Sequence, residues 1–176
     1  MSKSSGQSWT TFYRPQAVAE LDQASVREQL EAMMRAGYFP RVLLLTGPKG
    51  TGKTTTARLI GAILNDRGNE ELVRARYLKS KTGSDSLTGS LLEPERSDPL
   101  IQRILRGTAY VVQELDAASN RGIQEIRELK ERVSLTPIEG VLSVYILDEV
   151  HMLTTPAFNA LLKLLEEPPD HVLFIL

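Results

Sequence analysis

Residues 47–54 have the types and spacing of a phosphate-binding loop. The segment GPKGTGKT fits the pattern G-x-x-x-x-G-K-[ST]. Its glycines let the backbone curl, so that successive N–H groups point at phosphate oxygens. Lys53 is suited to reach the β- and γ-phosphates of ATP, and the Thr54 hydroxyl is suited to coordinate Mg²⁺. The alternative is a tight glycine turn without a ligand. The predicted nucleotide-binding residues of this loop are Gly47, Pro48, Lys49, Gly50, Thr51, Gly52, Lys53, Thr54 and Thr55.

Two adjacent acids, Asp148 and Glu149, follow an apolar run over 141–147. A buried parallel strand that ends in an acid places the carboxylate at the C-terminal edge of the sheet, beside the phosphate loop. Asp148 is suited to hold Mg²⁺. Glu149 is suited to polarise a water for attack on the γ-phosphate, so Glu149 and Lys53 are the predicted catalytic residues. The second acid favours an ATPase over a kinase, whose acceptor is another substrate. The alternative for Glu149 is a capping or solvated side chain.

These residues need strands and helices to position them. Apolar runs predict strands, and amphipathic or alanine- and leucine-rich segments predict helices. Strands that alternate with helices imply an α/β fold, with a parallel sheet covered by helices on both faces. A capping box formed by Ser25 and Glu28 and a C-terminal Gly37 bound a further helix. Strands are predicted at 42–46, 109–115, 141–147 and 171–176; helices at 25–37, 53–65 and 122–133, after Pro99, and after the cap Thr155, with Phe158, Leu161, Leu162 and Leu165 inside.

The composition indicates one soluble domain with a core. The chain has 176 residues, of which 41% are hydrophobic, and 21 Lys and Arg nearly balance 22 Asp and Glu. Any contact with nucleic acid must therefore come from a local patch. The absence of cysteine excludes disulfides and thiolate zinc sites. With no signal peptide and no long apolar run, we expect no membrane contact and a cytoplasmic protein.

The domain organisation is expected to be simple. Residues 1–8 are predicted to be a disordered tail, and 9–176 a nucleotide-binding domain. Within it, 66–107 are rich in Ser, Gly, Asp and Pro and are predicted to form mainly a polar loop. His151 is expected to be structural, since no other metal-type ligands lie near it in the sequence. The RELKER run (127–132) is interpreted as the solvated face of a helix, with nucleic-acid contact as the alternative.

Several segments together resemble the gamma/tau subunit of bacterial DNA polymerase III, the AAA+ ATPase of the sliding-clamp loader. They are YRP (13–15), DAASN (116–120), DEVHML (148–153), AFNALLK (157–163) and LEEPP (165–169). The resemblance covers most of 12–65 and 108–176. Replication factor C small subunits share the phosphate loop and YRP, but their residues after the acidic pair usually differ from DEVHML.

The resemblance implies a subunit of a hetero- or homo-oligomeric ring that uses ATP and Mg²⁺ to load a sliding clamp on primed DNA. Residues 47–54 match the Walker A loop of that family, and Asp148 and Glu149 match its Walker B pair. Tyr13, Arg14 and Pro15 match the segment that folds over the nucleotide base. Arg121, at a helix start, lies on the side that in such rings tends to face DNA; the alternative is a solvated arginine.

The sequence departs from that family at three places. The family carries a four-cysteine zinc module where this chain has the polar segment 66–107, so we predict no zinc. The Val-Val-Gly-Gln after YRP is not kept, and Glu20 to Ala24 read ELDQA. The family continues past the fourth strand with a sensor threonine, an arginine finger and helical domains, so the AAA+ domain is expected to be cut off at Leu176. An arginine finger contributes ~10³-fold or more in rate. We therefore expect the isolated chain to bind nucleotide weakly and to hydrolyse it slowly or not at all.

Two function classes other than an ATPase stay open. A non-hydrolysing scaffold subunit of the same ring would tend to lose Lys53 or Glu149, and both are present. A P-loop phosphotransferase is disfavoured by the acidic pair. A replication factor C-like small subunit would change the class of organism but not the chemistry.

Overall fold

The computed structural model describes residues 13–78 and 88–176. In this part of the chain, four parallel strands form one sheet in the order β1-β4-β3-β2. Tyr145 in β3 lies between Gln113 of β2 and Phe174 of β4. The strands are β1 (Val42–Leu43), β2 (Val112–Asp116), β3 (Ser143–Asp148) and β4 (Val172–Ile175). The predicted tail, 1–8, lies outside the described residues.

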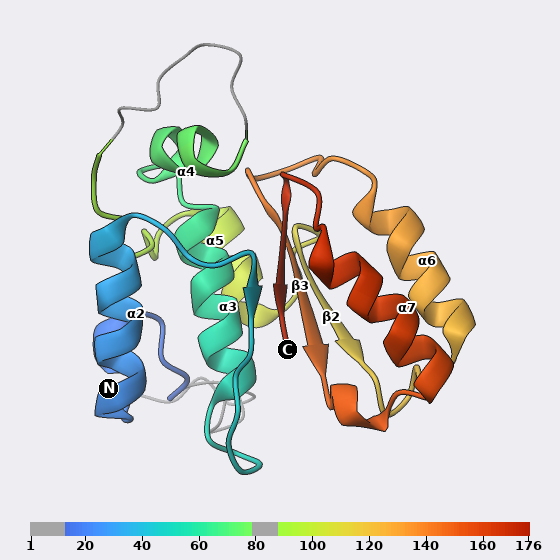
Figure 1. Cartoon of the computed structure of the whole chain (residues 1–176). Helices are drawn as coiled ribbons and strands as arrows, with labels where there is room; N and C mark the ends of the chain where they lie inside the picture. Colours follow the sequence, from blue (N-terminus) through green and yellow to red (C-terminus); the bar gives the residue numbers. More distant parts are fainter. Residues whose placement is uncertain (1–12, 79–87) are drawn as a thin grey trace.

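Helices cover both faces of this sheet (Figure 1). One side carries α2 (Ala24–Ala36), α3 (Lys53–Leu64), α4 (Glu70–Tyr77) and α5 (Pro99–Arg106). The other side carries α6 (Ile123–Val133) and α7 (Thr155–Glu166). Two short 3₁₀ turns, η1 (Val18–Glu20) and η2 (Val150–Met152), precede α2 and α7. The predicted fold class, an α/β domain with a parallel sheet covered on both faces, is confirmed.

Side chains of the inner strands alternate between two cores. In β3, Val144 and Ile146 pack with the core on the α3 side, whereas Tyr145 and Leu147 pack with the core on the α6 and α7 side. All four residues are buried. Because both faces of the sheet are covered, its inner strands are continuous apolar runs, which is the pattern that predicted them.

The edge strand β1 is shorter than the predicted strand at 42–46. Pairing with β4 continues irregularly, since Leu45 N donates to Leu176 O at 2.7 Å. Leu44 is 66% exposed. The chain at this point has a partner on one side only and must turn into the glycine loop, which ends the regular ladder early.

The structure corrects the prediction of a polar loop at 70–77, where α4 forms. Leu72, Val73 and Tyr77 are buried on one side of it. The Tyr77 hydroxyl donates to Phe39 O and accepts from Phe39 N, at 2.7 Å each. These tertiary contacts stabilise a short helix whose own sequence, EELVRARY, has little apolar periodicity. The predicted helix after Pro99 is confirmed as α5, where Asp98 caps the N-terminus.

Two predicted helix caps are wrong, and one is confirmed. The cap of α2 is Gln23, and Ser25 lies inside the helix, because Arg27 N donates to Gln23 O and extends the helical ladder back to that residue. Phe158 N likewise donates to Thr154 O, so the cap of α7 is Thr154 rather than Thr155. Gly37 is confirmed at the end of α2, with φ 68°.

The buried face of α7 also differs from the prediction. Leu161 is buried and Leu165 is partly buried, as expected, but Phe158 and Leu162 are each 40% exposed. The face that packs on the sheet consists of Ala157, Leu161 and Leu164. These residues follow the i, i+4, i+7 spacing of one helical stripe.

Candidate nucleotide-binding site

The glycine loop joins β1 to α3, and its backbone has a positive φ at Gly47, Gly50 and Gly52. Gly50 and Gly52 have φ values of 85° and 86°. A Cβ at either position would meet nothing within 4 Å. The backbone conformation therefore selects glycine, rather than a lack of space. Gly52 is also the N-cap of α3, so the loop ends at the positive end of the helix dipole, where anions are favoured.

The Lys53 side chain folds back over this loop. Its Nζ donates to Gly47 O at 2.9 Å and to Pro48 O at 3.0 Å. The Thr51 hydroxyl donates to Pro48 O at 2.9 Å. The ammonium group is thus held at the curve of the loop by backbone carbonyls, which places a full positive charge beside the α3 N-terminus.

The acidic pair lies at the C-terminal edge of the sheet. Asp148 is the last residue of β3, and it pairs in register with Asp116 of β2. Ala117 N donates to Asp148 O at 2.9 Å, and Glu149 N donates to Asp148 Oδ1 at 2.9 Å. These two bonds fix both the backbone and the carboxylate of Asp148 where the strand ends.

The loop and the acidic pair line one pocket of about 330 Å³. This volume lies within the range of roughly 300–1,000 Å³ that is usual for small-molecule sites. The predicted site residues that the pocket brings together are Gly47, Lys49, Lys53, Thr54, Asp148 and Glu149. The sequence predicted that the acidic pair would lie beside the loop, because the end of a central parallel strand and the loop after β1 share one edge of the sheet.

His151 lines the same pocket and was not predicted to do so. Its Nδ1 lies 3.4 Å from Glu149 Oε2. Its position two residues after Glu149 was the one sequence signal for a place in the pocket. Whether two side chains at this spacing face the same way depends on the backbone conformation between them, which the sequence does not give.

Other predicted site residues do not line this pocket. Pro48, Gly50, Thr51 and Gly52 shape the loop, and Thr55 lies in the first turn of α3. The segment Tyr13 to Pro15 and Arg121 are also outside the pocket lining.

Arg14 instead lies near Arg58 of α3 and Glu114 of β2. Burial and the neighbouring Arg58 guanidinium lower the pKa of Arg14, and Glu114 acts in the opposite direction. Arg121 is exposed just before α6, and its carbonyl accepts a hydrogen bond from Thr154 N at 3.1 Å.

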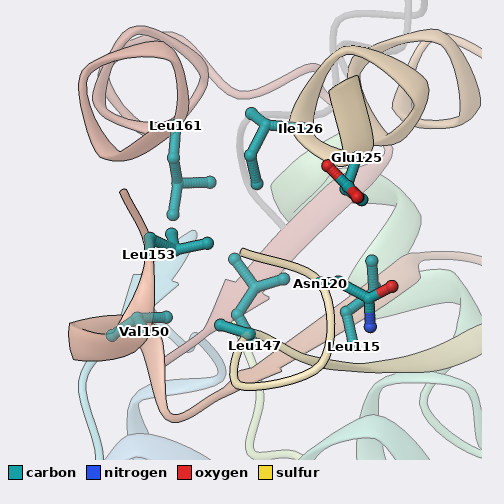
Figure 2. Close-up of a pocket in the computed structure, with 9 residues that line it drawn as sticks. Leu115, Asn120, Glu125, Ile126, Leu147, Val150, Leu153 and Leu161 are labelled. Atoms are coloured by element: carbon teal, nitrogen blue, oxygen red, sulfur yellow. The ribbon is translucent and has the colours of Figure 1, made fainter. Parts of the chain in front are cut away.

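A second, much smaller hollow lies between α6, α7 and η2 (Figure 2). Its volume is about 10 Å³, roughly the space of one water molecule. Its apolar lining includes Leu147, Val150, Leu153 and Leu161. It is too small for an organic ligand, and Val150 of η2 forms part of its lining.

The pocket suits Mg²⁺ only in the company of phosphates. Within residues 13–78 and 88–176, no three His, Cys, Asp or Glu side chains gather as a metal cluster. Mg²⁺ commonly keeps several waters and binds one or two carboxylates together with substrate phosphates. The Asp148 carboxylate and the Thr54 hydroxyl, both in the pocket lining, fit that pattern.

The glycine loop, the helix that follows it and the acid-ended strand beside it define an α/β P-loop domain of AAA+ type. Residues 22–176 match the family described as DNA polymerase III, delta subunit, and the chain belongs to that family. Among the residues described, no helix is both long and apolar enough to cross a membrane.

Curated relatives point the same way. The chain is 35% identical over 165 residues to the DNA polymerase III subunit tau of Bacillus subtilis, and the matched region covers 93% of the chain and 26% of that protein. It is 37% identical over 164 residues to subunit gamma/tau of Mycobacterium tuberculosis, with 93% and 25% covered. It is 34% identical over 165 residues to subunit tau of Escherichia coli, with 93% and 23% covered. The resemblance to gamma/tau subunits is thus confirmed, and the chain spans about a quarter of the length of these relatives.

Proposed function

We propose that this chain binds ATP with Mg²⁺ and hydrolyses it as a subunit of the DNA polymerase III clamp loader. One observation carries the proposal: Lys53, Thr54, Asp148 and Glu149 line a single pocket in a chain of a DNA polymerase III family. A glycine turn without a ligand gives no reason for the acidic pair to share a pocket with the loop.

Each residue has one task in this proposal. The loop N–H groups and Lys53 bind the β- and γ-phosphates. The Thr54 hydroxyl and the Asp148 carboxylate hold Mg²⁺, which neutralises charge on the phosphates. Glu149 accepts a hydrogen bond from the attacking water and orients it towards the γ-phosphate. The chain thereby supplies phosphate binding, metal binding and water activation from the glycine loop with the start of α3 and from the end of β3 with Glu149.

The cellular role rests on the relatives. They are named as tau and gamma/tau subunits of DNA polymerase III, and the chain matches about a quarter of each. We infer that its partners are the other clamp-loader subunits in a hetero- or homo-oligomeric ring, the sliding clamp and primed DNA, in the cytoplasm. The proposal also assigns contact with the nucleotide base to Tyr13, Arg14 and Pro15, and contact with DNA to Arg121.

A second candidate is a non-hydrolysing scaffold subunit of the same ring. The matched family is described by a subunit other than tau or gamma, so membership alone does not establish hydrolysis. The ATPase is favoured because both Lys53 and Glu149 are present in the pocket lining.

A single-turnover assay separates these two functions. The chain is incubated in excess over radiolabelled ATP and Mg²⁺, so that even slow hydrolysis is counted. We expect slow hydrolysis by the wild type, and a rate at least ~100-fold lower for Glu149→Gln, with unchanged ATP binding. Glu166→Gln, an exposed glutamate at the end of α7, is the matched control. Equal rates for wild type and Glu149→Gln would remove Glu149 from the reaction, and ATP binding that Lys53→Ala does not weaken would favour the scaffold.

A further inference from the structure

Glu149 has an unusual backbone conformation. Its φ is 54° and its ψ is 38°, and within the described residues it is the one non-glycine residue with positive φ. The left-handed region is unfavourable for a residue with a Cβ, because the Cβ comes too close to the following carbonyl oxygen. Such a conformation persists only where the surrounding structure imposes it.

Contacts on both sides impose this conformation. Before it, Glu149 N donates to the carboxylate of Asp148, and after it, Met152 N donates to Glu149 O at 2.8 Å. Val150, the next residue, lines the small hollow with Leu147 and Leu153 (Figure 2). The chain therefore turns sharply at Glu149 into η2, and this turn brings His151 back beside the Glu149 side chain.

The Glu149 carboxylate itself is held much more loosely. Its side chain is 46% exposed, and that of His151 is 71% exposed. Across the described parts of the chain, the His151 contact, 3.4 Å from Nδ1 to Oε2, is the only ion pair or side-chain hydrogen bond of this carboxylate. The nearby ammonium of Lys53 is engaged by the loop carbonyls. The strained turn thus fixes the backbone of Glu149, and His151 is the group that can orient its carboxylate.

We propose that His151 is a positioning residue for Glu149. With its proton on Nδ1, the imidazole attracts Oε2 and limits rotation of the carboxylate within the pocket that both residues line. With a lone pair on Nδ1, the same approach would be repulsive, so the proposed contact needs a proton on Nδ1. The effect on hydrolysis rests on the proposed function, whereas the contact itself does not.

The contact between His151 and Glu149 is not expected to add to the free energy of unfolding. Exposed ion pairs contribute little to the free energy of unfolding, because solvent screens them. A variant without the imidazole should therefore fold as the wild type does. Asparagine offers a specific rescue, because its Nδ2 is separated from the backbone by the same number of bonds as His Nδ1.

NMR of the imidazole nitrogens tests the contact without nucleotide. Spectra are recorded at a pH where His151 is neutral, on the full chain and on Glu149→Ala. We expect the Nδ1–H tautomer in the wild type and a shift towards Nε2–H in Glu149→Ala. An Nε2–H tautomer in the wild type, or no response to Glu149→Ala, would overturn the proposal.

Single-turnover hydrolysis tests the consequence. We expect His151→Ala to lower the rate about 10-fold, with affinity for a fluorescent ATP analogue within about 2-fold, since a small misplacement of a reacting group has effects of this order or larger. His151→Asn should recover most of the rate. Met152→Ala, on the same turn but outside the pocket lining, is the control.

The two proposals fail in different ways. A wild-type rate in His151→Ala would overturn the positioning role while leaving the ATPase in place. A chain that does not bind ATP would overturn the proposed function, and the NMR result would still decide the contact.

Discussion

Asn65 and Leu142 exchange two hydrogen bonds. Asn65 Nδ2 donates to Leu142 O at 3.0 Å, and Leu142 N donates to Asn65 Oδ1 at 3.1 Å. Asn65 caps the end of α3, and Leu142 immediately precedes β3. The helix that starts with Lys53 and the strand that ends with Asp148 are therefore joined directly at their far ends. Asn65 fixes the relative position of the two elements that carry the candidate site.

We expect Asn65→Ala to be strongly destabilising. The buried amide also donates to Gly61 O at 3.0 Å and accepts from Val141 N at 2.7 Å. Its removal leaves several buried backbone groups without partners, each costing roughly 1–3 kcal/mol. We predict a loss of about 3 kcal/mol in the free energy of unfolding, measured by urea denaturation.

Asn120→Ala is the matched control for that prediction. Asn120 also donates to a backbone carbonyl, Asp116 O at 2.9 Å, but it is exposed to solvent. We expect it to cost less than about 1 kcal/mol, because water can replace the lost bond. Similar losses in the two variants would show that Asn65 does not join α3 to β3 in the manner described.

The strained turn at Glu149 predicts a variant that is more stable and less active. Glu149→Gly removes the Cβ at a φ of 54° and should raise the free energy of unfolding by about 1 kcal/mol. It should also abolish hydrolysis, because the carboxylate is lost. Glu149→Ala loses the carboxylate but keeps the strain, so it should gain no stability. Thermal or urea unfolding of the three proteins decides this, and a Gly variant no more stable than the Ala variant would argue against strain at this residue.

We expect the Asp116 carboxylate to contribute less to the free energy of unfolding in acid than at neutral pH. Hydrogen bonds from the Ser119 hydroxyl at 2.6 Å and from Ala118 N at 2.8 Å lower the pKa of Asp116 below its usual value of 3.8. A carboxylate whose pKa is lower in the folded state stabilises the protein above the unfolded pKa. That contribution is lost as the pH falls through the folded pKa.

Urea unfolding of wild type and Asp116→Ala across the range from about pH 6 down to about pH 2 measures this contribution. Glu20 and Glu95, whose pKa values are also lowered, act equally in both proteins. The stability difference between the two proteins should therefore shrink as the pH falls below 3.8. A difference that does not change with pH would show that the Asp116 carboxylate is not preferentially ionised in the folded state.

Local rules predicted the parts of the structure that depend on local geometry. The glycine loop could be predicted because left-handed φ values at Gly50 and Gly52 leave few other residue types. Gly37 ends α2 for the same reason. The shared edge of the loop and Asp148 followed from parallel strands alone, since their C-terminal ends meet on one side.

Features set by tertiary contacts could not be predicted. The helix α4 depends on Tyr77 binding the backbone of Phe39, far away in sequence. The inward face of α7 depends on where the sheet lies, so Phe158 was placed inside although it is 40% exposed. His151 lies beside Glu149 because the backbone of Glu149 is left-handed. A glutamate does not indicate such a turn in a sequence, since this conformation is rare for residues with a Cβ.

We propose that the pocket between the glycine loop and the acidic pair binds Mg²⁺-ATP. Equilibrium titration of the chain with a fluorescent ATP analogue, with and without Mg²⁺, measures this binding. We predict Mg²⁺-dependent binding that Lys53→Ala weakens at least 10-fold, about 1.4 kcal/mol, while Lys163→Ala, an exposed lysine of α7 outside the pocket, leaves it unchanged. Equal affinities for wild type and Lys53→Ala, or no binding by either, would show that this pocket is not a Mg²⁺-ATP site.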